Sequence, residues 1–500
     1  MENNNSISAN RLPKVGLYTV GLRAYWSQFE GLKERLEGYG KFIEEKIAEY
    51  GEVYNYGLVD DEVTGRTAGE WFNEKNVDIV LCHSATYVTS SSVLPVHQIC
   101  KSPVVVLNLQ PTPEMNYGKT TTGEWLANCG ACPVPELANV FNRALIPYRI
   151  VNGLLGLDNT PDISMADEVT SKRVEAQIAW KKIIEWVRAA KVKRTLQHSR
   201  FGFLGNNYSG MLDMYSDFTM MQAQTGLHVE ILEMCDLDKY LTDVTDEDIK
   251  EKNKEINKFF EISGDSPSDP IAKKPTEDQL NWSAKVAVAQ EKMVKDYNLD
   301  GLAYYYHGNN DNYYEQVQSG FIVGHSLLTS KGVPCAGEGD LKTALAMKIC
   351  DTLGLGGSFC EIVAVDYNRQ TIIMGHDGPF HISISKGKPI LRGLGVYHGK
   401  KGSGVSVEAK VIDGAVTMLG VTQTYDGKLK LIISEGKAVD EPILTIGNTQ
   451  THIKFDVDPD NYMDRWFKEA PTHHFAMSVG HNAEQFKKVA ELLDIPYVVL

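Results

Sequence analysis

Two glutamates and two histidines toward the C-terminal end are the residues whose types and positions best suit chemistry. Glu338 lies between two glycines before a helical pattern, and Glu361 follows a Gly-Gly pair at the start of an apolar strand pattern. His376 lies in a Gly- and Pro-rich turn, and His474 belongs to a His-His pair at the start of a helical pattern. Carboxylate oxygens and imidazole nitrogens of this kind ligate Mn²⁺ or Mg²⁺, with water and substrate oxygens completing the coordination. The four residues together predict a metal centre.

Each of these residues also has an interpretation without a metal. A glutamate before a helix is stabilised there by the helix dipole, and a glutamate at a strand end is often simply exposed to water. Histidines in turns are usually solvated. Because all four residues lie at boundaries of predicted elements, we prefer the metal centre. The choice between His376 and His381 as the third ligand stays open at this stage.

The order of strand and helix patterns predicts the fold class. Up to about residue 357, short apolar strands alternate with helices, which indicates parallel sheets covered by helices. Beyond that point, short runs rich in Val, Ile and Thr recur roughly every 8–12 residues, which is typical of an antiparallel sheet or barrel. We therefore expect an α/β protein with two Rossmann-like α/β domains, over 12–195 and 196–357. A β-rich, barrel-like domain should follow over 358–500, and the polar start, 1–11, should be disordered.

Polar side chains at the ends of strands predict where a substrate binds. In parallel sheets ligands collect at the carboxyl ends of the strands. In the first predicted domain these ends carry Arg23, His83 and Gln110. We expect these three residues, and His473 beside His474, to bind the substrate. The charged, fork-shaped guanidinium of Arg23 suits a carboxylated, phosphorylated or differently configured sugar.

Composition and charge exclude several classes of protein. A formal net charge of -15 and the absence of a long basic run argue against nucleic acid or an anionic membrane as partner. No run approaches the roughly 20 apolar residues of a membrane span, and the polar start is not a signal peptide. The eight cysteines lack the spacing of a disulfide framework, so we expect reduced thiols in a cytoplasmic protein. Cys129 and Cys132 form a CxxC motif, which is either half of a zinc site or, as we prefer, a pair of packing or turn residues.

The motifs around the four candidate ligands resemble those of the L-arabinose isomerase family. AGEGDLKTA, which contains Glu338, and GGSFCE, which ends at Glu361, are similar to the segments that carry the first two metal ligands of that family. The third and fourth ligands correspond to His376 and His474. The resemblance implies a Mn²⁺ ion, with Co²⁺ or Mg²⁺ as alternatives, and a homo-oligomer, a trimer or hexamer. It also implies interconversion of an aldose and its 2-ketose through a cis-enediol, with Glu338 and Glu361 as the acid/base pair.

The segments that recognise the sugar differ from the family pattern. Where the family has a Ser-Gln-His-Leu-Tyr-like segment, this chain has VGLRAYW with Arg23, and a second, histidine-containing segment is replaced by LNLQPTPEMN. The resemblance therefore leaves the sugar unassigned. Two further functions stay open: a non-catalytic sugar-binding protein, since paired α/β domains also form binding clefts, and a metal-dependent sugar epimerase or lyase that uses similar enediol chemistry.

Overall fold

The computed structural model describes residues 11–159, 169–266, 269–308, 312–397 and 400–500. The predicted disordered start therefore lies, apart from Arg11, outside the described residues. The chain forms two compact units, one over 11–194 and one over 195–500, and each is described by itself. The second unit contains both the predicted central domain and the predicted β-rich domain, and the predicted boundary between these two stays a prediction.

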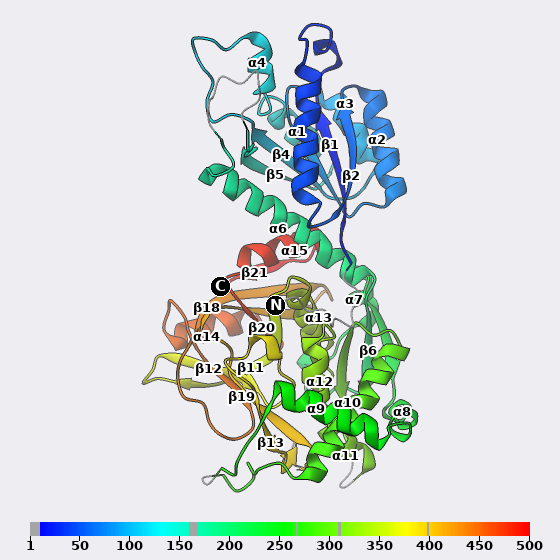
Figure 1. Cartoon of the computed structure of the whole chain (residues 1–500), viewed down its shortest axis with the longest axis vertical. Coiled ribbons are helices and arrows are strands. Elements are labelled where there is room, and N and C mark those ends of the chain that lie inside the picture. The colour runs from blue at the N-terminus through cyan, green and yellow to red at the C-terminus, as the bar shows by residue number, and fades with distance from the viewer. Residues whose placement is uncertain (1–10, 160–168, 267–268, 309–311, 398–399) are drawn as a thin grey trace. The chain divides into compact units, whose positions relative to one another are not determined.

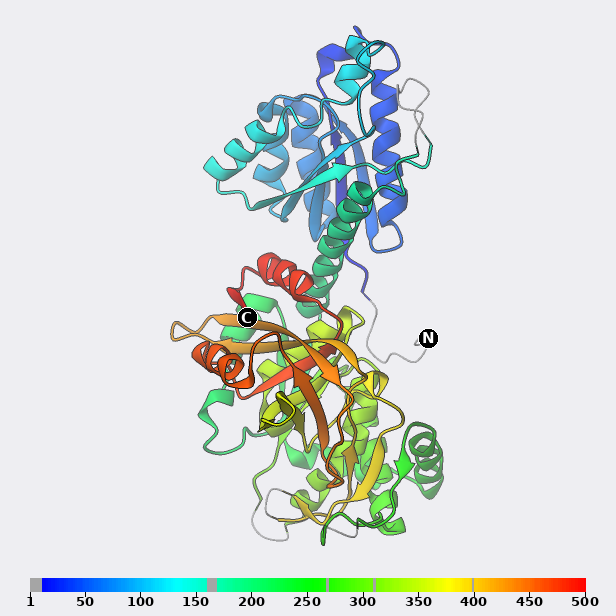
Figure 2. The same cartoon turned by 90° about the vertical axis from the view of Figure 1, so that its left-hand side faces the viewer.

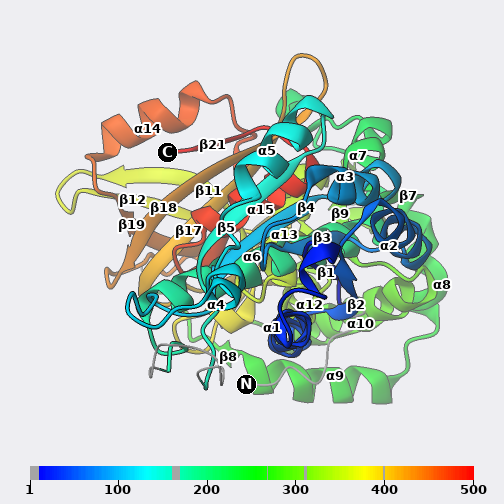
Figure 3. The same ribbon diagram turned by 90° about the horizontal axis from the view of Figure 1, so that it is seen from above.

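The first unit is a five-stranded parallel sheet with helices on both faces (Figure 1). The strand order is β2-β1-β3-β4-β5. Tyr18 of β1 points into a core shared with α2 and α3, whereas Thr19 next to it approaches α1, so alternate residues of β1 serve opposite faces. Figure 3 shows α1 and α3 on the two sides of these strands. The elements of this unit are β1 (Lys14–Val20), η1 (Arg23–Tyr25), α1 (Leu32–Ile47), β2 (Glu52–Val59), α2 (Glu62–Lys75), β3 (Ile79–His83), α3 (Ser90–Ile99), β4 (Val104–Gln110), α4 (Thr122–Ala127), α5 (Val134–Arg143), β5 (Tyr148–Leu154) and α6 (Val174–Gln197).

The second unit begins with a four-stranded parallel sheet in the order β10-β9-β6-β7. Its central strand β9 is buried along its whole length, as expected for a sheet that helices cover on both faces. The elements here are β6 (Arg200–Gly205), η2 (Leu212–Met214), α7 (Phe218–Thr225), β7 (His228–Leu232), η3 (Met234–Leu237), α8 (Asp238–Thr242), α9 (Asp246–Phe259), β8 (Glu261–Ile262), α10 (Glu277–Asp296), β9 (Gly301–Tyr305), α11 (Tyr313–Ser319), α12 (Phe321–Ser330), β10 (Cys335–Ala336), η4 (Gly337–Gly339) and α13 (Leu341–Thr352).

The rest of the second unit is built on an antiparallel β-barrel, with strands coloured from yellow to red in Figure 2. The strand order is β17-β20-β11-β12-β19-β18, and pairing of β18 with β17 closes the ring. A small sheet, β16-β13-β8, ties this part to the preceding α/β part. The elements are β11 (Gly356–Asp366), β12 (Thr371–His376), η5 (Ile382–Ile384), β13 (Ile390–Gly393), β14 (Val396–Tyr397), β15 (Lys400–Lys401), β16 (Val405–Glu408), β17 (Gly414–Gln423), β18 (Leu429–Val439), β19 (Thr449–Lys454), α14 (Pro459–Lys468), β20 (His474–Val479), α15 (Ala483–Leu493) and β21 (Tyr497–Val499).

The structure confirms the predicted fold class and corrects one element. Parallel α/β sheets precede a barrel of antiparallel strands, as the patterns indicated. The segment that begins at His474, however, is strand β20 rather than part of a helical segment. Its apolar run fits both periods, and burial between β11 and β17 selects the strand. Among the residues that the structure describes, no helix combines the length and apolar character needed to cross a membrane.

Candidate metal centre

Three of the four predicted ligands meet because their strands are neighbours in the barrel. β11 lies between β12 and β20, and Glu361 on β11 is opposite His474 on one side and opposite Gly375 on the other. Gly375 directly precedes His376, so the three candidate side chains come from neighbouring positions on three adjacent strands. The ring of Phe359 packs against both imidazoles, with ring centroids 4.7 Å from His376 and 4.3 Å from His474. This packing restricts the rotation of both histidine rings.

Glu338 reaches the same place from the end of the parallel sheet. It lies in η4, directly after β10, with a left-handed backbone (φ 58°). The neighbouring Gly339 has φ +77°, and a Cβ atom there would lie 2.5 Å from the backbone oxygen of Asn206, so this position admits only glycine. The turn is held from the segment after β6, because the Tyr208 amide donates to the Glu338 carbonyl (2.9 Å) and the Asn207 side chain donates to the Gly339 carbonyl (2.7 Å).

Together these residues form two overlapping groups of potential metal ligands. One group is Glu338, His376 and His474, and the other is Glu361, His473 and His474. Within each group the ligand atoms lie within 4.8 Å of one another, a separation that small side-chain movements close around one ion. Two carboxylates and buried imidazoles suit a divalent cation of the Mn²⁺ class. Among the described residues, the alternative ligand His381 belongs to neither group and instead contacts Ser383 (Nδ1–Oγ 2.9 Å).

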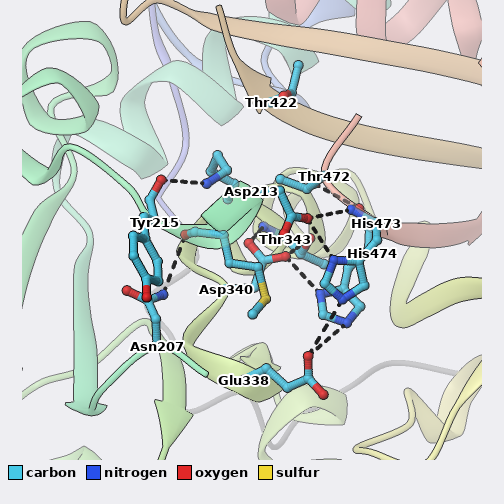
Figure 4. A network of polar contacts seen from close by, with 12 residues as sticks. Asn207, Asp213, Tyr215, Glu338, Asp340, Thr343, Thr422, Thr472, His473 and His474 are labelled. Carbon is cyan, nitrogen blue, oxygen red and sulfur yellow. Dashed lines mark hydrogen bonds and ion pairs between the residues drawn. The ribbon is translucent and has the colours of Figure 1, made fainter. Parts of the chain in front are cut away.

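His474 has the tautomer that a metal ligand needs. Its Nδ1 lies 3.0 Å from Oδ2 of Asp340, a buried carboxylate that also caps α13 by accepting from the amide and the hydroxyl of Thr343. Burial raises the pKa of Asp340, but the contact with His474 outweighs it and the net pKa is lowered. An ionised Asp340 accepts the Nδ1 proton, which leaves a lone pair on Nε2, 3.5 Å from Glu338 (Figure 4). Burial lowers the pKa of His474 and keeps it neutral. A carboxylate behind a metal-binding histidine orients the ring in this way.

His473 is held differently from its neighbour. Its Nδ1 lies 2.7 Å from Oδ2 of Asp213, and its Nε2 lies 3.6 Å from Oε2 of Glu338. Burial lowers the pKa of His473, but its interactions with Glu338 and Asp213 outweigh this and raise the pKa to about 9. The surroundings of the two adjacent histidines therefore shift their pKa values in opposite directions, upward for His473 and downward for His474.

His376 is fixed through its backbone and its ring. Its amide donates to the hydroxyl of Thr449 and its carbonyl accepts from the same hydroxyl, both at 2.9 Å. Its Nδ1 lies 3.0 Å from Asp377. Burial lowers the pKa of His376, but the interaction with Asp377 outweighs this and raises it. The ring is thus buried between Phe359 and the site, with a carboxylate at one of its nitrogens.

The three substrate-binding candidates in the first unit have other surroundings. Arg23 forms ion pairs with Asp60 (2.8 Å) and Asp61, which raise its pKa against an opposing effect of burial. Because two carboxylates already face this guanidinium, the anionic substrate that its charge indicated is disfavoured. His83 is buried beside Thr19 (Nδ1–Oγ1 3.3 Å), and burial lowers its pKa to about 3. Gln110 is partly buried and donates to the carbonyl of Thr112. Substrate binding by these residues stays a prediction.

Sequence reasoning missed two carboxylates that contact the adjacent histidines, and it assigned the wrong redox state to one cysteine pair. Asp213 lies in the short helix η2, and its contact with His473 spans 260 positions in the sequence. Asp340 caps α13, and its contact with His474 was not predicted. Cys129 and Cys132 form a disulfide, so the prediction of eight reduced thiols is wrong for this pair, and the bonded sulfurs are not free to bind zinc. The other six cysteines are free.

Comparisons with known proteins fit this geometry. The family model of the L-arabinose isomerase central domain matches residues 205–356, and that of the L-fucose isomerase C-terminal domain matches residues 391–500. The chain is 25% identical over 329 residues to L-arabinose isomerase 2 of Bacillus licheniformis, covering 64% of this chain and 66% of that protein, just under two thirds of its length. It is 22% identical over 467 residues to L-arabinose isomerase of Herpetosiphon aurantiacus, covering 85% of this chain and 91% of that protein.

Two further matches complete the comparison. L-arabinose isomerase of Bacillus subtilis is 20% identical over 369 residues, covering 71% of this chain and 69% of that protein. A solute-binding protein of an ABC transporter from Burkholderia multivorans has a TM-score of 0.17 and 13% identity, covering 65% of this chain and 97% of that chain. That TM-score carries no argument about fold or function. The sequence relatives and the two family models therefore carry the comparison.

Proposed function

We propose, on the premise that this chain belongs to an arabinose isomerase-like family of sugar isomerases, that it is a metal-dependent aldose–ketose isomerase. The reaction interconverts an aldose and its 2-ketose through a cis-enediol. The observation that carries the proposal is the meeting of Glu338, Glu361, His376 and His474, which come from four elements and offer ligand atoms within 4.8 Å of one another in two overlapping groups.

In this proposal the four residues hold a divalent cation, with Mn²⁺ as the first choice and Co²⁺ or Mg²⁺ as alternatives. When bound, such an ion polarises the sugar carbonyl and the neighbouring hydroxyl. His474 contributes through Nε2, because Asp340 occupies its other nitrogen. His376 contributes from the end of β12, where Thr449 fixes its backbone.

Glu338 and Glu361 act as the acid/base pair that moves a proton between C1 and C2 of the sugar. A carboxylate within roughly 3 Å of the proton is needed for such a transfer. Glu361 starts the exposed half of β11 and Glu338 sits on a rigid turn, so the two carboxylates approach the site from different elements. A carboxylate has two oxygens, so each glutamate can face the ion with one and the substrate with the other.

The proposal also covers the residues that recognise the sugar. We propose that Arg23, His83 and Gln110 of the first unit take part in substrate binding, and that His473 of the second unit does so as well. The ion pairs of Arg23 with Asp60 and Asp61 favour a neutral sugar over a sugar acid or sugar phosphate. The homo-oligomeric state, a trimer or hexamer, and a cytoplasmic location remain part of this proposal. The mass of the assembly in solution tests the first of these.

The deciding experiment is a screen of C5 and C6 aldoses, ketoses and uronates with added Mn²⁺, followed by substitution of the glutamates. Glu338→Gln and Glu361→Gln should each lower turnover about 10²–10⁴-fold. Glu247→Gln, on the exposed face of α9, is the matched control and should leave turnover unchanged. If both glutamine variants kept wild-type turnover, the acid/base assignment would be wrong.

Two outcomes separate the alternative functions. A protein that binds sugars without converting them, and that carries no stoichiometric metal, would be a binding protein. A metal-dependent protein that incorporates deuterium from the solvent without shifting the carbonyl would be an epimerase or lyase.

A further inference from the structure

Asp213 is held close to the metal centre although nothing in the proposed chemistry uses it directly. One of its oxygens, Oδ2, accepts from both the backbone amide of His473 (3.0 Å) and the ring Nδ1 of His473 (2.7 Å). A two-point contact of this kind fixes the position of the residue as well as the orientation of its ring. With Nδ1 engaged, the other nitrogen, Nε2, faces Glu338 at 3.6 Å (Figure 4).

The neighbouring histidine is oriented by a different carboxylate. Asp340 accepts from Nδ1 of His474 at 3.0 Å, and both of these side chains are fully buried. Asp213 and His473, in contrast, have 39% and 35% of their side chains exposed. The pair Asp340–His474 is thus on the closed side of the centre, and the pair Asp213–His473 is on a side that a solute can reach.

The loop that carries Asp213 is itself anchored to the start of α13. Lys342, a buried residue on the first turn of α13, donates through Nζ to the carbonyl of Tyr215 (3.2 Å) and to the hydroxyl of Ser216 (3.0 Å). The side chain of Asn207 contacts the carbonyls of Met214 (3.4 Å) and Gly339 (2.7 Å). Asn207 therefore holds both the turn of Glu338 and the segment of Asp213.

Ion pairs that are this exposed add little to stability, so stability does not account for the contact between Asp213 and His473. Positioning of His473 does account for it, because a displacement of a reacting or binding group by about 1 Å can lower the rate 10²-fold. We propose that Asp213 is a positioning residue, which holds His473 as the hydrogen-bonding partner of Glu338 and of the sugar, while Asp340 holds His474 for the metal. This inference rests on the proposed function and deepens it.

The test compares Asp213→Asn with Asp340→Asn. Mn²⁺ alone is titrated into each metal-free protein, and kcat and KM are measured with the sugar that the wild-type protein converts. Asp340→Asn should weaken Mn²⁺ binding about 10- to 100-fold. Asp213→Asn should bind Mn²⁺ as the wild type does, with kcat lowered about 10²-fold and KM changed less than about threefold. Asp213→Glu, which keeps the acceptor, should recover part of the lost kcat.

A matched control is available on the same unit. Glu230 is a partly exposed carboxylate that contacts His228 at 3.4 Å, and Glu230→Gln should leave kcat, KM and Mn²⁺ binding unchanged. Wild-type kcat in Asp213→Asn would overturn the inference, because the contact would then be a surface ion pair only. A loss of Mn²⁺ binding in Asp213→Asn equal to that of Asp340→Asn would also overturn it, since His473 would then be a metal ligand.

Failure of the proposed function is distinguishable from failure of this inference. If the wild-type protein converts no sugar, the proposed function is wrong. Crystal structures of the wild type and of Asp213→Ala then decide the positioning role. A ring of His473 that turns away from Glu338 in the variant supports it, and a ring that keeps its place overturns it.

Discussion

The two parallel sheets of this protein share a strand order but differ in what lies at their carboxyl ends. In the first, β1 lies between β2 and β3; in the second, β6 lies between β7 and β9. In both sheets the strand order therefore reverses beside the first strand, and such switch points are where α/β sheets place ligands. The shared strand order therefore gives each sheet an edge that is suited to binding a ligand. The chemistry differs because of the side chains that follow the strands.

At the first edge, charges are already matched inside the unit. Arg23 faces Asp60 and Asp61, and His83 is neutral and buried. At the second edge, Glu338 faces His473 and His474, and its interaction with His473 contributes to the raised pKa of that imidazole. The comparison teaches that the carboxylates at the first edge are paired with an arginine, whereas the carboxylate at the second edge faces imidazoles, which are also potential metal ligands.

Replacing one histidine at each edge should give the largest measurable difference between the two edges. His474→Gln should lower Mn²⁺ affinity by more than about 100-fold, because the loss of a ligand exceeds the usual cost of losing a ligand's partner. His83→Gln should leave Mn²⁺ affinity unchanged and raise KM less than about tenfold, as expected for a group that only binds. Metal titration and steady-state kinetics on both variants check this. Loss of metal binding in His83→Gln would contradict the division between the two edges.

The turn that carries Glu338 gives the next largest effect. Gly339→Ala should destabilise the protein by about 1–3 kcal/mol, because φ is +77° and the new Cβ would meet the backbone of Asn206 at 2.5 Å. Mn²⁺ affinity should fall as well, since the turn aims the carboxylate. Gly354→Ala is the matched control: φ is +74°, but a Cβ there meets nothing within 4 Å, so its cost should be only about 1 kcal/mol. Thermal unfolding of both variants measures the difference, and equal losses would show that the close approach does not matter.

A smaller effect is expected from Arg23→Gln at the first edge. If the guanidinium serves Asp60 and Asp61 rather than an anionic substrate, KM for a neutral sugar should change less than about threefold. A rise of KM by 10²-fold or more for a sugar acid or phosphate would show that Arg23 binds the anion directly. Kinetics with matched neutral and acidic sugars distinguish the two results.

The smallest expected effect is a pH dependence of the stability that the contact between Arg23 and Asp60 contributes. Burial raises the pKa of Asp60, but the hydrogen bonds from Arg23 and Trp26 outweigh it, so the folded-state pKa is lowered. The contribution of this contact is therefore present above the unfolded pKa of about 3.9 and is lost as the pH falls through the folded value. The melting temperatures of wild type and Arg23→Gln should differ slightly at pH 6 and converge near pH 3. A difference that stays constant over this range would contradict the assignment.

Local motifs were sufficient to select the four candidate ligands, whereas the contacts that these residues make with distant segments could not be predicted from them. Glu338 and Glu361 are preceded by glycines that mark tight turns, and the periodicity of the strands around them is readable in one sequence. The strand register that places Glu361 opposite His474 depends on barrel closure, which no local pattern encodes. The helical period assigned to residues 474–479 failed for the same reason, because pairing with two strands overrides local preference.

Two further contacts lay beyond the reach of sequence reasoning. The partners of Arg23 follow β2, 37 positions away, and they come close only because β1 and β2 are neighbours in the sheet. The disulfide between Cys129 and Cys132 depends on the conformation of a turn before α5 that composition does not reveal.

The place of β20 in the barrel sets the order in which the centre can be assembled during synthesis. β20 follows β18 and β19 along the chain, yet it lies between β17 and β11, where its two edges pair with strands made much earlier. Until residues 474–479 leave the ribosome, the barrel has a gap between these strands and the centre lacks the imidazole of His474. His376, Glu361 and Glu338 precede His474 by 98, 113 and 136 positions, so each is synthesised well before it. A nascent chain therefore acquires the complete set of candidate ligands late, together with closure of the barrel.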